Sequence, residues 1–468
     1  MKLSPPWVEK RKDADGNSRL SFRTRLLLFL VLFLVAVLWC AFRSFGTPVT
    51  VNWNVTHQTI DGFGASATGY VSGLSPRQID QFFDPDRGLG LSLLRIHVIA
   101  DIKDADCDCV ANSAPARCAR GSDSQIVSGD LEVAQSASSR GVRLIAAPWS
   151  PPAEMKSSGK FCSDGLMNGG TENYARYAGQ LVDFLSFLKQ KGISIDAISV
   201  QNEPDEQNSS YDTAKWTGKQ IHDFVPILSQ AMSKANLEEV KIAAPEQEAW
   251  KFDLMDDSMS DPDVVDKIGI VFGHAYTSEN PSGLPSVGTR HIWQTEVSDF
   301  TTFDGSIADG LRWGSSIHNY MLAGVNAWMY WNIDCATAKF NHGNNMCLTD
   351  SDENLAKRAY VLGQFAKFVR PGWQRIDVTY NGPLLVTAFK GPKGDFAIVA
   401  INKGRLPIFN QSFRIDGTTS RHSEVLPWVT TSSQSLAAQQ PLEPDSNGSA
   451  FTYTIPGRSV VTFQGKGD

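Results

Sequence analysis

Residues Asp196 to Pro204, DAISVQNEP, decide the fold that we expect for this chain. They form a short apolar run that ends in a carboxylate, Glu203, and passes into loop-like sequence. Seven similar runs lie between Gln58 and Asp334, and amphipathic stretches separate them. They are QTIDGFGAS from Gln58, LSLLRIHV from Leu91, VRLIAAPWS from Val142, VKIAAPE from Val240, IGIVFGHAY from Ile268, RHIWQTEVS from Arg290 and GVNAWMYWNI from Gly324. Apolar runs that alternate with helical segments are typical of a parallel sheet covered on both faces.

Eight strands in this order predict a closed (β/α)8 barrel over residues 58–373. An open, doubly wound sheet is the alternative, but no glycine-rich phosphate loop follows a strand to favour it. The helical period is clear in Tyr174 to Lys189, where one face carries Tyr177, Leu181, Phe184, Leu185 and Leu188.

The sequence pattern changes after the breaker cluster Arg370 to Gly372. From Arg375 to Gly465, period-two alternation and turns replace helices, which predicts an antiparallel β-sandwich. The strand-like stretch Pro48 to His57 is expected to join it. We therefore assign residues 374–466, together with residues 48–57, to a β-sandwich domain.

Two glutamates, Glu203 and Glu296, each end an apolar run. Burying a carboxylate without partners costs several kcal/mol, so its presence twice calls for a chemical reason. Hydrolysis of a glycosidic bond needs one protonated carboxyl group to assist the leaving oxygen and one ionised carboxylate to attack or to activate water. The alternative is that each glutamate is a surface residue just past a strand. The occurrence of two, both among Trp, Asn and Gln, favours the catalytic interpretation.

Other polar and aromatic residues end the same runs, where barrel enzymes carry their active sites. They are Trp149, Asn202, His274, Tyr276 and Trp331. Arg95 lies inside the second run, where it could pair with a catalytic carboxylate and keep it ionised. A salt-bridged structural arginine is the alternative for Arg95.

The net charge of −7 and the pI near 5.7 argue against nucleic-acid binding, because no basic stripe is available to neutralise phosphates. Six cysteines outside the N-terminal region suit an oxidising compartment: Cys107, Cys109, Cys118, Cys162, Cys335 and Cys347. Cys335 and Cys347 could clamp one loop, and one of the first three could reach Cys162. Metal binding by Cys107, Cys109 and Cys118 is the alternative, but the spacing lacks a two-plus-two zinc pattern. We expect no metal and no cofactor; the oligomeric state stays open.

The N-terminus predicts a membrane anchor. Residues 1–25 form a basic tail, and the uncharged run Leu26 to Phe42 is about as long as the lower limit for a spanning helix. Positive charge before the run predicts a cytoplasmic N-terminus and an exported catalytic domain, which is extracellular, periplasmic or luminal. A cleaved signal peptide, and hence a secreted protein, is the alternative. The run lacks a clear small-x-small cleavage site, which disfavours a cleaved signal peptide. Bulky Trp39 before Cys40 disfavours lipid attachment.

From about Val51 to the C-terminus, the chain resembles glycoside hydrolase family 30. The resemblance lies in the order and spacing of six motifs. These are DGFGAS (Asp61 to Ser66), LLRIHV (Leu93 to Val98), APWSPP (Ala147 to Pro152), QNEP (Gln201 to Pro204), QTE (Gln294 to Glu296) and KRAYVLGQFAKFVRPG (Lys357 to Gly372).

The resemblance implies that Glu203 is the general acid/base and Glu296 the nucleophile of a retaining mechanism. It further implies that Asn202 hydrogen-bonds the hydroxyl next to the reacting carbon, and that Tyr276 donates to Glu296. Trp149 and Trp331 would provide flat surfaces for the sugar ring.

The motif KRAYVLGQFAKFVRPG is most similar to the bacterial xylan-cleaving branch, whose glucuronoxylanases hold a glucuronic acid side group with an Arg and a Tyr on the loop after strand eight. Here that loop, DCATAKFNHGNNMCLTDSDEN from Asp334, has no Arg, and Lys339 offers a point charge only. Glu154 stands where the family often has a second Trp. The resemblance therefore implies a xylan-type polysaccharide without settling dependence on glucuronic acid. The alternatives are a glucosylceramidase-like enzyme, a β-1,6-glucan hydrolase and a non-catalytic carbohydrate-binding protein.

Overall fold

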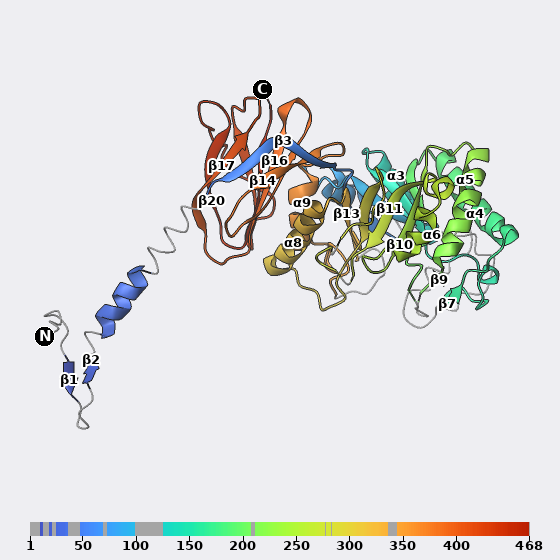
Figure 1. Ribbon diagram of the computed structural model, residues 1–468, viewed down its shortest axis with the longest axis horizontal. Coiled ribbons are helices and arrows are strands. Elements are labelled where there is room, and N and C mark those ends of the chain that lie inside the picture. The colour runs from blue at the N-terminus through green and yellow to red at the C-terminus, as the bar shows by residue number, and fades with distance from the viewer. Residues whose placement is uncertain are drawn as a thin grey trace.

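The computed structural model describes residues 10–12, 18–20, 25–35, 47–68, 73–98, 125–206, 211–276, 278–281, 283–335 and 344–467. Two bodies dominate it, a parallel barrel and a β-sheet domain that contains the C-terminus (Figure 1). The predicted barrel and the predicted β-domain are both confirmed.

Eight parallel strands close the barrel, and each of the eight apolar runs contributes one of them. In barrel order they are β4 (Gly62–Ala67), β5 (Leu93–Val98), β6 (Arg143–Pro148), β8 (Ile195–Ser199), β10 (Lys241–Gln247), β11 (Ile268–His274), β12 (His291–Glu296) and β13 (Ala327–Tyr330), which pairs back to β4. The barrel interior is filled by Leu93, Ile145, Ala197, Ala243, Ile270, Phe272, Trp293, Ala327 and Met329. These side chains make the barrel a packed core rather than a pore.

Helices cover the outside of the barrel and pack their apolar faces against the strands. They are α2 (Pro76–Phe83), α3 (Gln125–Ser138), α4 (Thr171–Gln190), α5 (Gly218–Lys234), α6 (Asp256–Met259), α7 (Pro262–Val265), α8 (Ile307–Ala323) and α9 (Lys357–Ala366), with the short 3-10 helices η1 (Ala153–Met155) and η2 (Asp253–Met255). On α4, Tyr177, Leu181, Leu185 and Leu188 are buried as expected, and Phe184 is partly buried. A small two-stranded sheet, β7 (Cys162–Leu166) with β9 (Thr213–Lys215), lies outside the barrel.

The second body is a nine-stranded sheet in the order β19-β18-β21-β16-β15-β14-β3-β17-β20. Its strands are β3 (Val49–Thr59), β14 (Gln374–Thr379), β15 (Leu385–Lys390), β16 (Phe396–Asn402), β17 (Ile408–Asp416), β18 (Val425–Thr430), β19 (Ala437–Ala438), β20 (Ala450–Ile455) and β21 (Ser459–Gly465), and η3 (Pro392–Gly394) links β15 to β16. The expectation of an antiparallel domain is wrong at one strand pair, because β3 pairs in parallel with β17. The reason is that β3 comes from before the barrel and inserts between β14 and β17.

The two bodies share an interface made by α8 and α9 against β15, β16, β18 and β21. Gln364 of α9 donates to the Thr430 hydroxyl at 2.9 Å, and the Thr462 hydroxyl donates back to the Gln364 carbonyl at 2.7 Å. Apolar residues of the sheet domain, including Phe389 and Ile401, belong to the same core as the barrel helices.

The described part of the N-terminal region is small. Residues 10–12 and 18–20 pair as the strands β1 (Lys10–Lys12) and β2 (Ser18–Leu20), and residues 25–35 are helical. Among the described residues, no helix combines the length and the apolar character needed to cross a bilayer. Residues 36–42 of the expected anchor lie outside the described residues.

One disulfide joins Cys335 to Cys347, the pair that sequence proximity suggested, with Cα atoms 5.6 Å apart. Cys107, Cys109 and Cys118 lie outside the described residues, as does the side chain of Cys162. Lys339 lies outside them too.

Candidate active site

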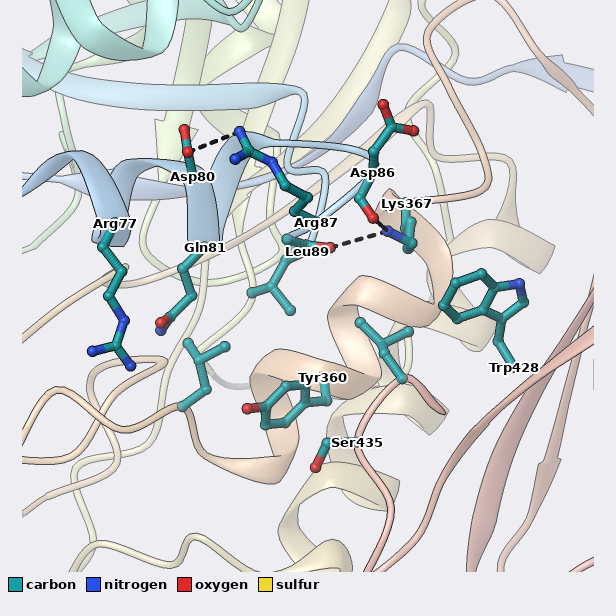
Figure 2. Close-up of a pocket in the computed structure, with 13 residues that line it drawn as sticks. Arg77, Asp80, Gln81, Asp86, Arg87, Leu89, Tyr360, Lys367, Trp428 and Ser435 are labelled. Carbon is teal, nitrogen blue, oxygen red and sulfur yellow. Dashed lines mark hydrogen bonds and ion pairs between the residues drawn. The ribbon is translucent and has the colours of Figure 1, made fainter. Parts of the chain in front are cut away.

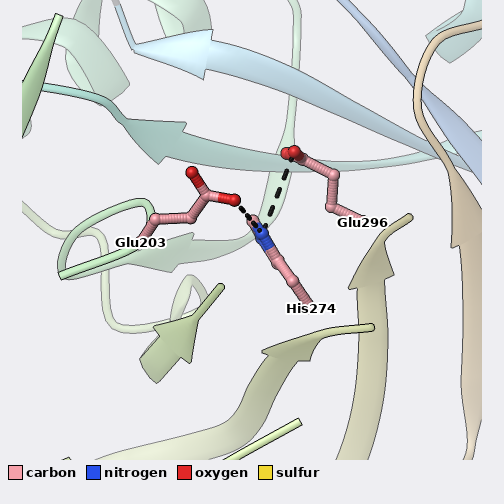
Figure 3. Close-up of side chains that lie close together, drawn as sticks. All are labelled: Glu203, His274 and Glu296. Atoms are coloured by element: carbon pink, nitrogen blue, oxygen red, sulfur yellow. Dashed lines mark hydrogen bonds and ion pairs between the residues drawn. The ribbon is translucent and has the colours of Figure 1, made fainter. Parts of the chain in front are cut away.

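The two glutamates meet at the end of the barrel where the strands finish. Glu296 is the last residue of β12, and Glu203 lies four residues after β8 ends at Ser199. A ring nitrogen of His274, at the end of β11, lies between them, and Figure 3 shows both carboxylates turned toward it. One oxygen from each carboxylate and this nitrogen all lie within 4.8 Å of one another. Both glutamates are only 5% exposed, so they share one buried site.

Arg95 lies at the centre of this site and links three acceptors. Its Nη1 donates to Glu296 at 2.7 Å, its Nη2 donates to Asn202 Oδ1 at 2.6 Å, and its Nε donates to Glu246 at 3.0 Å. The guanidinium is completely buried. Burial lowers the pKa of Arg95, but Glu246 and Glu296 more than offset this effect, so the group stays charged. Arg95 therefore fixes the orientation of Glu296 and Asn202 together.

Glu246, at the end of β10, is a third buried carboxylate in the site. Its Oε1 accepts from Arg95 and, at 3.0 Å, from the Thr295 hydroxyl, and it lies 3.5 Å from Nε2 of His274. Burial alone would raise the pKa of Glu246, but Arg95 and His274 lower it to about 2. Glu246 is therefore an ionised counterion for the two cationic groups behind the glutamate pair.

His274 connects all three carboxylates. Its Nδ1 lies 2.9 Å from Glu203 Oε1 and 3.8 Å from Glu296 Oε1. Burial lowers the pKa of His274, yet Glu296, Glu203 and Glu246 raise it to about 10. Glu203, His274 and Glu296 are close enough to hold a metal ion. A metal-binding histidine must be neutral, however, so this charge arrangement favours a proton at His274 over a metal.

Two tyrosines donate to the glutamate pair. The Tyr276 hydroxyl donates to Glu296 Oε1 at 2.8 Å, and the Tyr211 hydroxyl donates to Glu203 Oε2 at 2.9 Å. Burial and the adjacent carboxylates raise the pKa of both phenols, so both remain donors. Burial also raises the pKa of Glu296, and the neighbouring His274 and Arg95 act in the opposite direction.

Asn202 and two tryptophans border the glutamate pair. Asn202 Nδ2 is buried and has no partner among the described residues, so this donor is available to a ligand. The rings of Trp149 and Trp331 lie 5.6 Å apart and belong to one small apolar cluster. The Arg95 guanidinium carbon lies 4.5 Å from the Trp149 ring centre, so Trp149 also supports Arg95. Glu154 lies outside this cluster on the surface, where it pairs with Arg176 at 3.4 Å.

All eight residues expected from the sequence therefore occupy one site. Three neighbouring residues were not expected: Glu246, Tyr211 and Phe300. Glu246 ends the run VKIAAPE and so carries the signal that singled out Glu203 and Glu296, a carboxylate that closes an apolar run. Tyr211 has no such signal, because it comes from an irregular loop. Phe300 is 63% exposed and stacks on Tyr276 with ring centres 5.6 Å apart, which also depends on loop geometry alone.

Comparison with known proteins gives the family. The model of O-glycosyl hydrolase family 30 matches residues 85–303, and that of the family 30 β-sandwich domain matches residues 372–463. Glucuronoxylanase XynC of Bacillus subtilis (strain 168) is 30% identical over 438 residues, which cover 89% of this chain and 91% of XynC. The chain belongs to glycoside hydrolase family 30. This membership makes it an O-glycosyl hydrolase and agrees with the two-body architecture.

Two further relatives differ in how much of this chain they match. The crystal structure of the subfamily 8 xylanase Xyn30A from Clostridium acetobutylicum has a TM-score of 0.73 and 29% identity, and the match covers 90% of this chain and 99% of that one. Putative glucosylceramidase 1 of Caenorhabditis elegans is 26% identical over 296 residues, 57% of this chain and 56% of the relative. The similarity to the xylanases extends over much more of the chain.

Proposed function

We propose that this family 30 enzyme hydrolyses a xylan-type polysaccharide with retention at the anomeric carbon. The proposal depends on one distance: an oxygen of the Glu203 carboxylate lies within 4.8 Å of an oxygen of the Glu296 carboxylate. Retaining glycosidases hold their carboxyl groups about 5 to 5.5 Å apart, whereas inverting enzymes need about 6.5 to 9.5 Å to admit a water. Similarity to a glucuronoxylanase and to a family 30 xylanase over about nine-tenths of the chain supports the substrate class.

In the first step, Glu296 attacks the anomeric carbon and the bond to the leaving oxygen breaks, while Glu203 gives its proton to that oxygen. In the second step, Glu203 takes a proton from water, the water oxygen bonds to the anomeric carbon, and the bond to Glu296 breaks. Asn202 Nδ2, buried and unpartnered among the described residues, is placed to donate to the sugar hydroxyl beside the reacting carbon. Arg95 and Tyr276 hold Glu296 in position for the attack.

The substrate class is tested by a screen of the full-length protein on glucuronoxylan, arabinoxylan, β-1,6-glucan, glucosylceramide and aryl β-glycosides. We expect reducing ends from both xylans, since the loop from Asp334 to Asn354 has no Arg to select a glucuronic acid group. A β-anomer as first product, observed by NMR, would confirm retention. An α-anomer would contradict the role of Glu296.

The role of Glu296 is tested by Glu296→Ala. This variant should release no measurable reducing sugar from xylan but should still bind the polymer, because only the nucleophile is lost. An equally inactive parent protein that binds xylan would instead favour a binding function.

A glucosylceramidase-like activity is the second candidate. Residues 25–35 form a helix whose apolar side chains are exposed, with Leu26 at 49% and Phe29 at 66%. Such a helix would bring the enzyme close to lipid-linked substrates. Hydrolysis of glucosylceramide in preference to xylan in the same screen would establish this alternative.

We also propose that residues 26–42 anchor the enzyme in a membrane, with residues 1–25 in the cytoplasm and the catalytic domain exported. The support is the basic segment before the run and the exposed apolar helix over residues 25–35. Full-length protein should stay with membranes in carbonate and be released by detergent. Release by carbonate or salt would contradict the anchor.

A further inference from the structure

A cavity of about 600 Å³ lies at the junction of the barrel and the sheet domain (Figure 2). It is lined by α2, the segment between α2 and β5, α9 and the region around β18. The segment Asp84 to Ser92 leads into the start of β5, whereas Arg77 and Tyr360 lie in the first turns of α2 and α9, so the cavity extends along the outside of the barrel between these helices. Glu203 and Glu296 lie where the strands finish and are not among its lining residues. The volume is within the range of about 300 to 1,000 Å³ that is typical of ligand sites.

Five polar groups of this cavity have no hydrogen-bond partner among the described residues: the Arg77 guanidinium, the Gln81 amide, the Asp86 carboxylate, the Tyr360 hydroxyl and the Trp428 indole N-H. Arg77 and Gln81 project from α2 in the same direction, and Tyr360 lies across from them on α9 (Figure 2). An amide and a guanidinium side by side offer several donors and one acceptor. The groups of Arg77, Gln81 and Tyr360 thus border the same side of the cavity, where Arg77 is exposed to solvent.

Three other charged side chains of the cavity, Asp80, Arg87 and Lys367, have partners in the protein. Asp80 accepts from Arg87 at 2.9 Å and from Arg140 at 2.7 Å. Lys367 donates to the carbonyls of Pro85 at 2.6 Å and of Asp86 at 2.9 Å. No strong single-sign field therefore remains, which disfavours a multiply charged ligand such as a nucleotide.

Aromatic and apolar surfaces complete the lining. The Trp428 ring is half-buried, its centre lies 5.3 Å from that of Phe368, and Lys367 Nζ lies 5.2 Å from the Trp428 ring centre. Leu89, Leu355 and Leu436 supply the apolar lining. A sugar has apolar C-H faces that suit aromatic rings and hydroxyl edges that suit planar amide and guanidinium groups. Flat rings beside free hydrogen-bonding groups match this amphipathic chemistry.

We infer that this cavity is a second binding site for a polysaccharide strand, separate from the catalytic site. The inference rests on the proposed function for the class of ligand. Because the cavity lies on the outside of the barrel and neither Glu203 nor Glu296 lines it, one short oligosaccharide does not occupy both sites. A long or particulate polymer engages both sites, and its apparent affinity rises through effective concentration.

The test compares two double variants in full-length, detergent-solubilised protein carrying Glu296→Ala, so that the probe is not degraded. Arg77→Ala with Gln81→Ala removes two of the unpartnered groups of the cavity. Gln230→Ala with Lys234→Ala is the matched control, because it also removes one amide and one cation, four residues apart, from a surface helix, α5. The probe is soluble xylan in affinity electrophoresis. We expect the cavity variant to bind about five- to tenfold more weakly than the control, as the loss of two hydrogen-bonding groups implies.

Equal xylan affinity of the two double variants would overturn the inference. Tyr360→Phe, which removes a single hydroxyl and keeps the ring, should weaken xylan binding about two- to threefold and provides a test independent of α2. In protein with Glu296 intact, the cavity variant should keep its kcat/KM on an aryl β-xyloside. The separate activity screen shows whether the unmodified enzyme cleaves xylan. Failure of the proposed function is therefore distinguished from an absence of xylan binding at the cavity.

Discussion

Glu203 has a left-handed backbone, with φ of +44°, and its N-H donates to the Glu246 carbonyl at 3.0 Å. Glu246 itself has φ of +61°. Such conformations are uncommon for non-glycine residues and concentrate at functional sites. Both residues carry buried carboxylates of the active site, Glu203 just beyond β8 and Glu246 near the end of β10. The sequence gives no sign of these angles, which is why the mutual placement of Glu203 and Glu246 could not be foreseen.

Glu203→Gln tests the proton-transfer role. The variant keeps the shape of the side chain but cannot donate a proton, so kcat on xylan should fall by about 10²- to 10⁴-fold. An aryl glycoside with an acidic phenol needs no proton for departure, and its first chemical step should be nearly unaffected. Pre-steady-state release of the phenol measures that step. Equal losses on both substrates would contradict the acid role of Glu203.

A second prediction concerns the pKa of His274. This pKa is about 10 in the folded protein, whereas the ordinary pKa of histidine is 6.5. A raised pKa means that folding favours the protonated form. The stabilisation from His274 is therefore fully present below pH 6.5 and is lost as the pH rises toward 10. The difference in unfolding free energy between the parent and His274→Gln should shrink over that range in urea titrations.

His318 is the control with the opposite sign. Burial, with Arg375 nearby, lowers the pKa of His318 to about 4, so folding favours its neutral form. Its contribution is present above pH 6.5 and is lost as the pH falls toward 4. His318→Gln should therefore remove a pH dependence of the unfolding free energy that lies between about pH 4 and pH 6.5. If both histidine variants changed stability in the same pH window, the assignment of His274 as a buried cation would be wrong.

At the scale of elements, the strands of the barrel were predictable because each is a continuous apolar run. The positions of its functional residues followed, since parallel strands end at one face of the barrel. The parallel pairing of β3 with β17 was not predictable, because strand order depends on how the two bodies dock. Tyr211 and Phe300 were missed for a similar reason, as each lies in a loop whose path is set by tertiary contacts.

The packing of α8 against α9 leads to a prediction about stability. Gly314 of α8 faces α9 and the sheet domain, and a Cβ there would lie 2.8 Å from Val361 and 3.4 Å from Ile401. Gly314→Ala should therefore lower the free energy of unfolding by about 1 to 3 kcal/mol through overpacking.

Gly179 is the matched control for Gly314, because it lies in α4 and a Cβ there would have nothing within 4 Å. Gly179→Ala should raise the free energy of unfolding by about 0.5 to 1 kcal/mol, since alanine loses less backbone entropy in a helix. Equilibrium denaturation in urea measures both variants. A neutral or stabilising Gly314→Ala would show that α8 and α9 do not pack closely.

The barrel and one face of the sheet domain share a hydrophobic core, and the sheet domain has a second core of its own. Phe63 of β4 contacts Phe365 of α9 with ring centres 5.7 Å apart, and Phe365 contacts Phe389 of β15 at 6.5 Å. This series of rings leads from a barrel strand through a helix into the sheet domain. Separating the bodies would expose Phe365 and its neighbours to water. Each Å² of apolar surface exposed would cost about 25 cal/mol of free energy.

The barrel and the sheet domain should consequently unfold in one transition. Differential scanning calorimetry of the full-length protein in detergent should give a single peak whose calorimetric and van't Hoff enthalpies agree. A destabilising change in the sheet domain, such as Phe389→Ala, should move the whole peak to lower temperature, because Phe389 belongs to the core that the sheet shares with the barrel. Phe409→Ala is its control, since Phe409 is 55% exposed, and it should leave the peak nearly in place. Two resolved peaks, with Phe389→Ala shifting only one, would show that the domains fold independently.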